Sequence, residues 1–215
     1  MGSKYYSNTR SEMLEFIPND CVRLLDVGCS SGGFGRVLKE RRQVEVWGVE
    51  PFAEAAQEAE KHLDKVIRSF FDDAADLPKA YFDVITFNDS LEHFPDEYAP
   101  LKLAQTLLKP DGVIVTSIPN FRYLENLKHI ILEKDFKYTD AGILDRTHLR
   151  FFTLKSMRRL FEDIGMDVVS IQGINPHWWC GWKIFLLRML FGTHIEDMKY
   201  LQYVFVVKFK ANNSN

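Results

Sequence analysis

The chain has 215 residues, of which 46% are hydrophobic and 27% charged, and its formal net charge is −3. This composition is typical of a globular protein, and the length suffices for one α/β domain with a full core. A negative balance without a basic tail argues against a nucleic-acid binder, because phosphate contacts need a concentrated positive surface. Three cysteines without metal-ligand spacing argue against a disulfide framework. With no apolar signal core and no apolar run of ~18 residues, we expect a reducing, cytoplasmic compartment.

Short apolar segments alternate along the chain with segments whose apolar residues have helical spacing. The predicted strands are residues 23–27, 44–50, 65–68, 82–88, 112–118, 167–174 and 200–210. Helical spacing predicts helices at residues 34–38, 55–63, 101–108 and 154–164. Seven strands interleaved with helices predict a doubly wound, Rossmann-like, mostly parallel sheet in a single domain over residues 1–215. The last two strands lack a helical crossover, so the last strand is expected to run antiparallel.

Two segments do not fit this alternation. Residues 119–152 leave the carboxyl end of a strand, where ligands of open α/β sheets bind, and are therefore predicted to form a substrate lid. Residues 175–199 form an insertion between the last two strands, and its part 178–191 reads WWCGWKIFLLRMLF. A helix there would be apolar nearly all round and too short to span a bilayer. We expect burial against the body or a second subunit, with shallow membrane contact as the alternative.

A glycine-rich turn follows the first predicted strand. Residues 24–35 read LLDVGCSSGGFG, and the next strand ends on Glu50, 22 positions after Gly28. Glycines let the backbone approach a ligand closely, and the N–H groups at a helix N-terminus favour an anionic group. A carboxylate at the second strand tip can accept hydrogen bonds from two ribose hydroxyls. The pair predicts an adenosine-type cofactor.

Five motifs in order carry a family resemblance: LLDVGCSSG, GVEPF, FDVITFNDSLEHF, LKPDGVIVTSIPN and DRTHLRFFTLKSMRRLFEDIGMDVV. Together they resemble a class I S-adenosylmethionine-dependent methyltransferase over roughly residues 5–174. The similarity is greatest to the small-molecule branch of ubiquinone-biosynthesis O-methyltransferases and glycan-cluster methyltransferases. The family fold, a seven-stranded sheet with an antiparallel last strand, agrees with the prediction from the residues.

The resemblance also implies how residues hold the cofactor S-adenosylmethionine. Its methionine half would be lined by Asp26, Gly28, Cys29, Ser30 and Gly32. Its adenosine half would contact Glu50 through both ribose hydroxyls, and Pro51 and Phe52 near the adenine. Its sulfonium end would be lined by Asn88, Asp89 and Ser90, while Tyr6 and Arg10 close over the site from the N-terminal arm.

Two positions depart from the family pattern. Ser30 replaces the middle glycine of the usual G-x-G-x-G turn, so it needs an allowed backbone conformation and adds a hydroxyl group. The acid that many relatives place near the adenine amine is not obvious either. We expect the backbone of Phe71, with Asp72 nearby, to take that place.

Candidate catalytic residues lie in the lid and after the fourth strand. His148 is a candidate general base or a structural histidine, with Asp145 and Arg146 orienting the substrate or each other. Asp89, Glu92 and His93 form a cluster that some ubiquinone-type relatives use for a divalent metal. The alternative, which we favour, is that Glu92 and His93 cap the following turn, so no metal is predicted.

Other functions remain open from the residues alone. The turn matches the G-x-S-x-G of a serine hydrolase with Ser30 as nucleophile, although only 22 residues precede its strand. A NAD-dependent oxidoreductase, a nucleic-acid methyltransferase and a non-catalytic cofactor-binding module are further alternatives. We predict methyl transfer to a small-molecule or saccharide acceptor, at a hydroxyl held by the two insertions.

Overall fold

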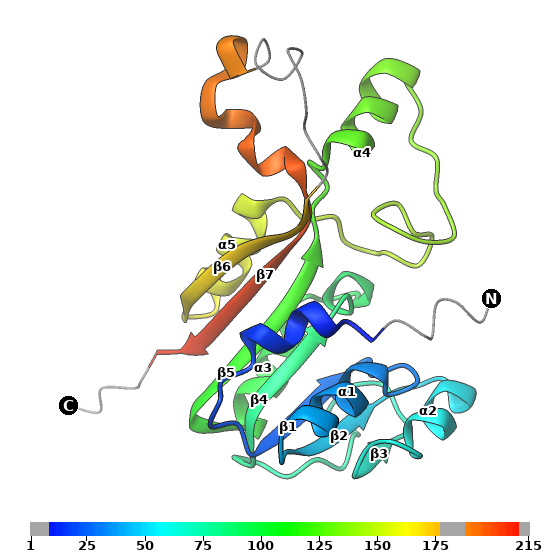
Figure 1. Ribbon diagram of the computed structural model, residues 1–215, viewed down its shortest axis with the longest axis vertical. Coiled ribbons are helices and arrows are strands. Elements are labelled where there is room, and N and C mark those ends of the chain that lie inside the picture. Colours follow the sequence, from blue (N-terminus) through cyan, green and yellow to red (C-terminus); the bar gives the residue numbers. More distant parts are fainter. Residues whose placement is uncertain (1–8, 177–187, 211–215) are drawn as a thin grey trace.

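The computed structural model describes residues 9–176 and 188–210, which form a seven-stranded sheet covered by helices (Figure 1). Its strand order is β3-β2-β1-β4-β5-β7-β6. The strands are β1 (Arg23–Val27), β2 (Glu45–Val49), β3 (Lys65–Ile67), β4 (Phe82–Asn88), β5 (Leu108–Pro119), β6 (Met166–Pro176) and β7 (Tyr200–Phe209). β1 to β5 pair in parallel, and β7 runs antiparallel to both β5 and β6. The predicted fold, with its antiparallel last strand, is confirmed.

Each face of the sheet has its own hydrophobic core. One face packs against η1 (Ser11–Phe16), α1 (Gly33–Arg41) and α2 (Ala53–Ala59), and the other against α3 (Tyr98–Leu107) and α5 (Leu154–Asp163). Met13 and Phe34 are buried in the first core, and Leu101 and Phe161 in the second. Burying such a side chain contributes about 1.5–3 kcal/mol, so the apolar stripes of these helices fix their placement.

The helix–sheet boundaries differ from the predicted ones where a turn lies inside an element. α2 ends at Ala59, short of the predicted 63, and Leu63 packs into the core from the turn that follows. β5 begins at Leu108, ahead of the predicted start at residue 112, because the Lys-Pro-Asp-Gly segment at 109–112 forms a bulge within the strand. The pairing of β4 with β5 shifts register between Phe82 and Val84 there.

The helix that follows the lid starts at a well-defined point. Thr153 and Ser156 form a capping box at the N-terminus of α5, which satisfies two of the backbone N–H groups that a helix start leaves free. Gly165, at φ +77°, follows the helix in the left-handed conformation that glycine adopts without steric cost. The return of the lid to the sheet is therefore fixed by local sequence.

The two insertions leave the sheet at its upper end (Figure 1). Residues 119–152 begin at the carboxyl end of β5 and include α4 (Leu124–Lys128) and a π-helical turn, η3 (His129–Glu133). The other insertion includes η4 (Gly192–Lys199), which leads into β7. No helix within residues 9–176 and 188–210 is long and apolar enough to cross a membrane.

Polar contacts tie the two insertions together at their bases. The Asn120 side chain is fully buried, and its Nδ2 donates to the carbonyl oxygens of Asp197 and Tyr200 at 2.8 and 3.0 Å. Arg122 pairs with the Asp197 carboxylate at 2.6 Å and donates to the carbonyl oxygen of His194. The lid and the second insertion thus share one polar junction.

Candidate active site

The turn after β1 has an alternating left-handed backbone. Gly28 has φ +75°, Ser30 +50° and Gly32 +77°. A side chain at Gly28 would also place a Cβ only 3.1 Å from the Cβ of Ser90, so glycine lets β1 and the β4 tip approach closely. Ser30 adopts the conformation at a cost of roughly 1 kcal/mol, because its Cβ crowds the following carbonyl oxygen. The sequence departure at Ser30 is therefore absorbed as backbone strain, and the turn keeps its shape.

Glu50 joins this turn to the tip of β2. It is 4% exposed, and its two carboxylate oxygens accept hydrogen bonds from the backbone N–H groups of Ser30 at 2.9 Å and Phe52 at 3.0 Å. Burial raises the pKa of Glu50, and the two backbone hydrogen bonds oppose that effect. A carboxylate offers about four acceptor positions. Each oxygen therefore keeps capacity for a ligand hydroxyl while it holds the turn.

The inner wall of the site is a buried polar group at the ends of β1 and β4. Asp26 accepts hydrogen bonds from Thr86 Oγ1 at 2.6 Å and Asn88 Nδ2 at 3.3 Å. Burial raises the pKa of Asp26 to about 6. Within the described residues, Asn88 Oδ1, Ser30 Oγ and Ser90 Oγ are buried without a hydrogen-bond partner. Buried polar atoms normally have partners, so this gap calls for a polar ligand.

Asp89 follows Asn88 but belongs to a different network. Its carboxylate forms an ion pair with Arg10 and accepts hydrogen bonds from Ser117 Oγ at 3.2 Å and Gln202 Nε2 at 2.5 Å. Arg10 also donates to Ser117 Oγ at 2.8 Å. This network attaches the chain before η1 to the carboxyl ends of β4 and β5. Arg10 therefore lies at the carboxyl ends of these strands, and its role in closing over the cofactor stays a prediction.

A second cluster joins η2 (Leu91–His93) to the lid. The ligand atoms of Glu92, His93 and His148 all lie within 4.8 Å of one another. Glu92 is 1% exposed, and neither of its carboxylate oxygens has a hydrogen-bond partner among the described residues. Its Oε1 lies 3.8 Å from His148 Nε2. Burial raises the pKa of Glu92 well above its usual value, with Asp89 adding to the effect.

Main-chain contacts bring His148 to this place. The carbonyl oxygen of Glu92 accepts the N–H groups of Leu149 at 2.8 Å and Arg150 at 3.1 Å, which fixes the lid against η2. His148 Nδ1 lies 2.9 Å from the carbonyl oxygen of Ile143. Such a carbonyl partner selects the tautomer with the proton on Nδ1. Nε2 is then the basic nitrogen, and it faces Glu92.

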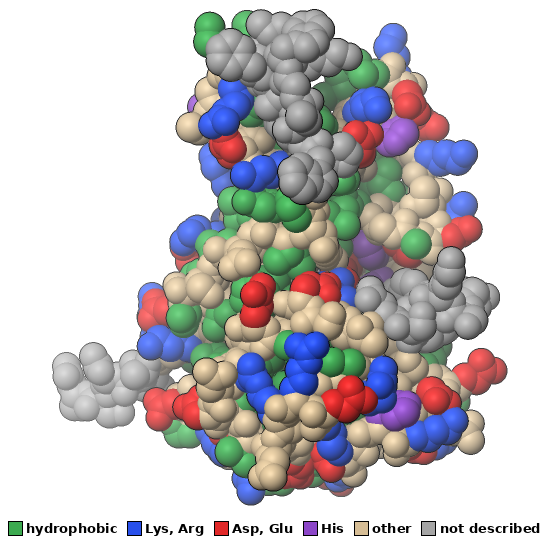
Figure 2. Space-filling model, in the orientation of Figure 1, with side chains coloured by type: hydrophobic (Ala, Val, Ile, Leu, Met, Phe, Trp, Pro, Cys, Tyr) green, Lys and Arg blue, Asp and Glu red, His purple; other side chains and the backbone are tan. Residues whose placement is uncertain are grey.

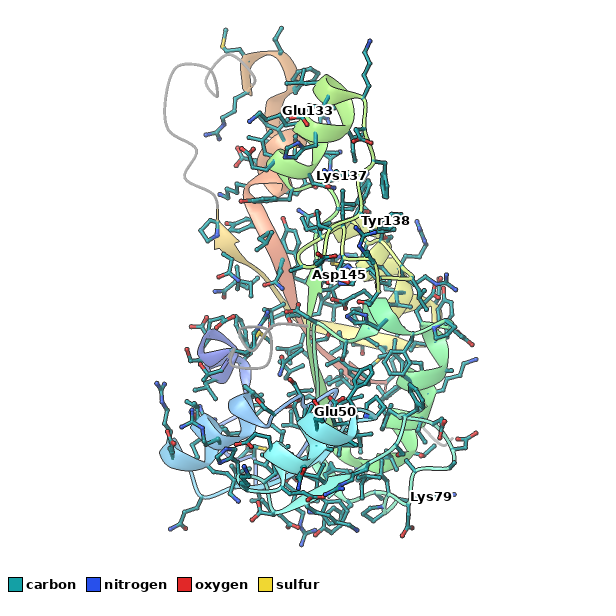
Figure 3. All side chains as sticks on the ribbon, turned by 90° about the vertical axis from the view of Figure 1, so that its right-hand side faces the viewer. Glu50, Lys79, Glu133, Lys137, Tyr138 and Asp145 are labelled. Carbon is teal, nitrogen blue, oxygen red and sulfur yellow. The ribbon has the colours of Figure 1, made fainter. Side chains whose placement is uncertain are left out.

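Asp145 supports the same turn of the lid. Its Oδ1 accepts the Thr147 N–H at 2.8 Å and the Thr147 hydroxyl at 2.6 Å, and these hydrogen bonds outweigh burial and lower the pKa of Asp145. Both contacts lie within the turn that leads to His148. The geometry thus makes Asp145 a positioning residue for His148. Figure 3 shows Asp145 between Glu50 in the lower half of the molecule and Glu133 near its upper end.

Sequence comparison now decides the family. The family model described as a methyltransferase domain matches residues 3–171. The chain is a class I S-adenosylmethionine-dependent methyltransferase. Its cofactor is therefore S-adenosylmethionine, and the interpretations as a NAD-dependent oxidoreductase or a serine hydrolase are wrong. The hydroxyl of Ser30 has no hydrogen-bond partner among the described residues, so no base activates it.

Two curated relatives and a solved structure illustrate the similarity. The methyltransferase is 27% identical to a ubiquinone biosynthesis O-methyltransferase of Neisseria meningitidis, over 72% of this chain and 68% of the relative. It is 29% identical to another of that name from Vibrio atlanticus, over 71% and 66%. The chain thus spans about two thirds of these relatives. A SAM-dependent methyltransferase from Archaeoglobus fulgidus superimposes with a TM-score of 0.68 at 21% identity, over 96% of this chain and 95% of that one.

The residues at the carboxyl ends of β1, β2 and β4 fit this cofactor in the methyltransferase, and we call them the cofactor site. The unpartnered oxygens of Ser30, Asn88 and Ser90 provide polar contacts, and Glu50 has acceptor capacity for a ribose diol. Phe52, beside Glu50, is 65% exposed and can pack against a flat ring. The donors and acceptors that the cofactor needs are therefore gathered at one edge of the sheet.

Other predicted cofactor residues take different places. The Cys29 side chain is buried beneath Gly48, where a Cβ would lie 2.4 Å from its Sγ, so only its backbone faces the turn. Phe71 packs its ring edge-to-face on Phe87, at 5.8 Å between centroids, and Asp72 accepts the N–H of Ala74 in its own turn. Their place near the adenine stays a prediction. Tyr6 lies outside the described residues.

The contact between Glu92 and His148 was missed by sequence reasoning. The predicted cluster joined Asp89, Glu92 and His93, which are neighbours in sequence. In the structure Asp89 is engaged by Arg10, and His148 takes its place beside Glu92. A separation of 56 positions through an irregular lid leaves no spacing signal for this pair.

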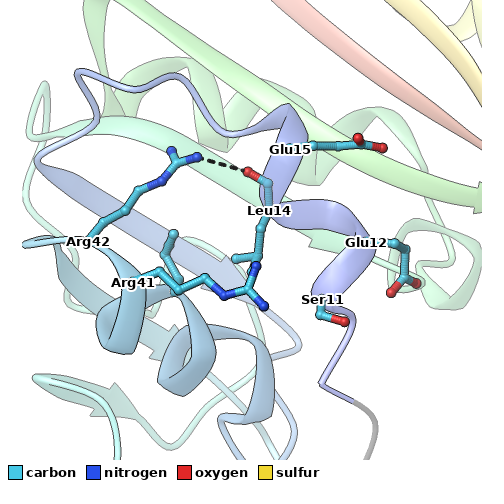
Figure 4. A pocket seen from close by; sticks show the side chains of 7 residues that line it. Ser11, Glu12, Leu14, Glu15, Arg41 and Arg42 are labelled. Atoms are coloured by element: carbon cyan, nitrogen blue, oxygen red, sulfur yellow. Dashed lines mark hydrogen bonds between the residues drawn. The ribbon is translucent and has the colours of Figure 1, made fainter.

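A cavity of about 430 Å³ lies between η1 and α1, and it is lined neither by the predicted cofactor residues nor by Glu92, His93 and His148 (Figure 4). Arg42 crosses it and donates to the carbonyl oxygens of Leu14, Ile17 and Pro18. None of its lining residues is a predicted site residue. Arg42 holds η1 against the end of α1, so the role of this side chain is structural.

Proposed function

We propose that this chain transfers the methyl group of S-adenosylmethionine to a hydroxyl of a small-molecule or saccharide acceptor. The names of the curated relatives, ubiquinone biosynthesis O-methyltransferases, support an oxygen acceptor. The lid and the second insertion leave the same end of the sheet as the turn after β1, Glu50 and Asn88. We propose that they hold the acceptor.

The cofactor, when bound, supplies a methyl group already activated on a positive sulfonium. The protein's task is then to orient the acceptor oxygen and exclude water. Glu50 and the turn at 28–32 would hold the adenosine and methionine ends, and Asn88 and Ser90 would line the sulfonium end. The lid closes the site from the other side through the contact of Glu92 with Leu149 and Arg150.

The observation that carries the acceptor assignment is the unpartnered carboxylate of Glu92. A buried carboxylate without hydrogen bonds is costly unless it is neutralised or paired. His93 and His148 place imidazole nitrogens within 4.8 Å of it, which is the donor set of a divalent cation site. We propose that these three residues hold a divalent cation, which would lower the pKa of an acceptor hydroxyl. His148 then acts as a ligand, and its candidate role as a general base becomes the alternative.

The test is an acceptor survey that measures S-adenosylhomocysteine release with phenols, catechols, sugars and amines, before and after treatment with EDTA. We expect turnover with hydroxyl acceptors, methyl ether products, loss with EDTA, and recovery with Mg²⁺ or Zn²⁺. Glu92→Gln keeps the shape of the side chain but removes its charge, so it should lose turnover and keep cofactor binding.

His129→Ala is the matched control, because His129 is an exposed lid histidine that pairs with Glu133. It should leave turnover unchanged. Methylation at nitrogen would contradict the hydroxyl acceptor. Turnover that withstands EDTA but falls in His148→Ala would overturn the cation and restore the general base.

A further inference from the structure

The tips of the two insertions expose large apolar side chains. On η3, Ile131 and Leu132 are 66% and 70% exposed. On the second insertion, Met189, Leu190 and Phe191 are 72%, 76% and 54% exposed. Consecutive large apolar residues exposed in this way are unusual on a surface that meets only water. We call these five residues the apolar tips.

Both tips lie at the same end of the molecule. Figure 1 shows α4 with η3, and the helical segment before β7, at the upper end of the longest axis. Figure 3 places Glu133, beside Leu132, at that end in a second view, far above Glu50. The junction of Asn120 and Arg122 with Asp197 holds the two insertions together at their bases. A flat surface can therefore meet both tips without touching the sheet.

The charge around the tips indicates what kind of surface they meet. Residues 124–134 carry two acidic and two basic side chains, and residues 188–199 also carry two of each. A neutral tip has no electrostatic attraction for nucleic acid or for a strongly charged protein. Blue and red side chains are interspersed near this end in Figure 2, which shows no field of one sign. Association there must rely on apolar burial.

The sequence beside the second tip indicates the occupant. The chain between Pro176 and Arg188 reads HWWCGWKIFLL, with three tryptophans and one lysine. Tryptophan concentrates at the boundary between headgroups and hydrocarbon in membranes, where its amphipathic ring is stable. We propose that the apolar tips insert into the interfacial layer of a lipid bilayer and attach this methyltransferase to membranes peripherally. Apolar insertion drives this attachment, and attraction to anionic lipid contributes little.

The test is vesicle flotation of the full chain with phosphatidylcholine vesicles, with and without phosphatidylglycerol, at low and high salt. We expect binding to both vesicle types that changes little with salt. The double variant Leu132→Asp/Leu190→Asp should bind at least about tenfold more weakly, because it replaces two apolar side chains whose burial would drive insertion with charged ones. Both side chains are exposed, so the variant should still fold and bind S-adenosylhomocysteine.

Val22→Asp is the matched control. Val22 is 57% exposed and precedes β1, at the end of the sheet opposite to the insertions. This variant should therefore bind vesicles like the parent protein. Absence of vesicle binding by the parent protein would overturn the proposal. So would equal binding by the double variant, or binding that requires phosphatidylglycerol and disappears in salt. If light scattering shows a dimer that the double variant converts to monomers, the tips are a subunit interface instead.

Discussion

The cofactor site at the ends of β1, β2 and β4 is built differently from the cluster of Glu92, His93 and His148, which we call the acceptor cluster. In the cofactor site, the Glu50 carboxylate accepts hydrogen bonds from the N–H groups of Ser30 and Phe52. One βαβ unit therefore provides both the turn and the acid that stabilises it. In the cluster, Glu92 meets His148 across a lid, and no hydrogen bond satisfies its carboxylate among the described residues. Glu50 and the turn already hold each other before a ligand arrives, whereas the carboxylate of Glu92 depends on what it binds. Cofactor affinity and acceptor chemistry should therefore be separable by mutation.

The largest expected effect is the loss of cofactor affinity in Glu50→Ala. The change removes the carboxylate that we propose as the acceptor for two ribose hydroxyls, and hydrogen bonds to a charged group contribute about 1.5–3 kcal/mol each. S-adenosylmethionine affinity should fall at least about 100-fold, as measured by titration calorimetry. Glu54→Ala, an exposed carboxylate in the first turn of α2, is the matched control and should bind normally. Unchanged affinity in Glu50→Ala would remove the ribose assignment.

The next effect is the pH dependence of the stability that the buried carboxyl group of Asp26 contributes. Burial raises the pKa of Asp26 to about 6 from an ordinary value near 4. The folded protein thus binds this proton more tightly than the unfolded chain, so the stability that Asp26 contributes falls as pH rises from about 4 to 6. Asp26→Asn has no proton to lose. Its stability relative to the parent protein should increase by up to about 3 kcal/mol across that window.

Denaturant unfolding of the two proteins between pH 4 and pH 7 measures this difference. Asp83→Asn is a useful comparison, because pairing with Lys109 lowers the pKa of Asp83. A pKa below the unfolded value gives stability that is lost as pH falls, which is the opposite sign. A constant stability difference between Asp26→Asn and the parent protein would contradict the buried-carboxyl interpretation.

The smallest effect comes from the strained position in the turn. Ser30→Gly relieves a left-handed backbone that costs serine roughly 1 kcal/mol, but glycine gives back part of this through unfolded-chain entropy. We expect stabilisation of about 0.5 kcal/mol and intact cofactor binding, measured by thermal unfolding and calorimetry. Ser31→Gly, at the neighbouring position, should destabilise instead. Equal effects at the two positions would show that strain at Ser30 is unimportant.

The sequence predicted those parts whose residues are neighbours in one regular unit. The spacing of the apolar strands predicted the sheet. The spacing between the turn after β1 and Glu50 predicted the cofactor site. The start of β5 was predicted four residues too late, because a Pro-Asp-Gly segment is typical of a turn whether or not the strand continues through it. Likewise, the resemblance placed Arg10 and Asp89 at one site, but their ion pair was not predicted, because the two residues are 79 positions apart.

The lid shows the same limit more strongly. His148 and Glu92 were each singled out by their chemistry, but their contact was not predicted, because an irregular segment has no period from which a contact can be inferred. The backbone hydrogen bonds of Glu92 to Leu149 and Arg150, which set the pair, carry no side-chain signal at all. The residues of the acceptor cluster were therefore predictable in type, and their assembly was visible only in the structure.

Calorimetric titration of S-adenosylmethionine into the parent protein, Glu50→Ala and Glu92→Gln tests the separation of the two halves most directly. We predict that Glu92→Gln binds the cofactor as tightly as the parent protein, whereas Glu50→Ala binds it at least about 100-fold more weakly. An equal loss of cofactor affinity in both variants would show that Glu92 belongs to the cofactor site. It would contradict the assignment of the Glu92, His93 and His148 cluster to the acceptor.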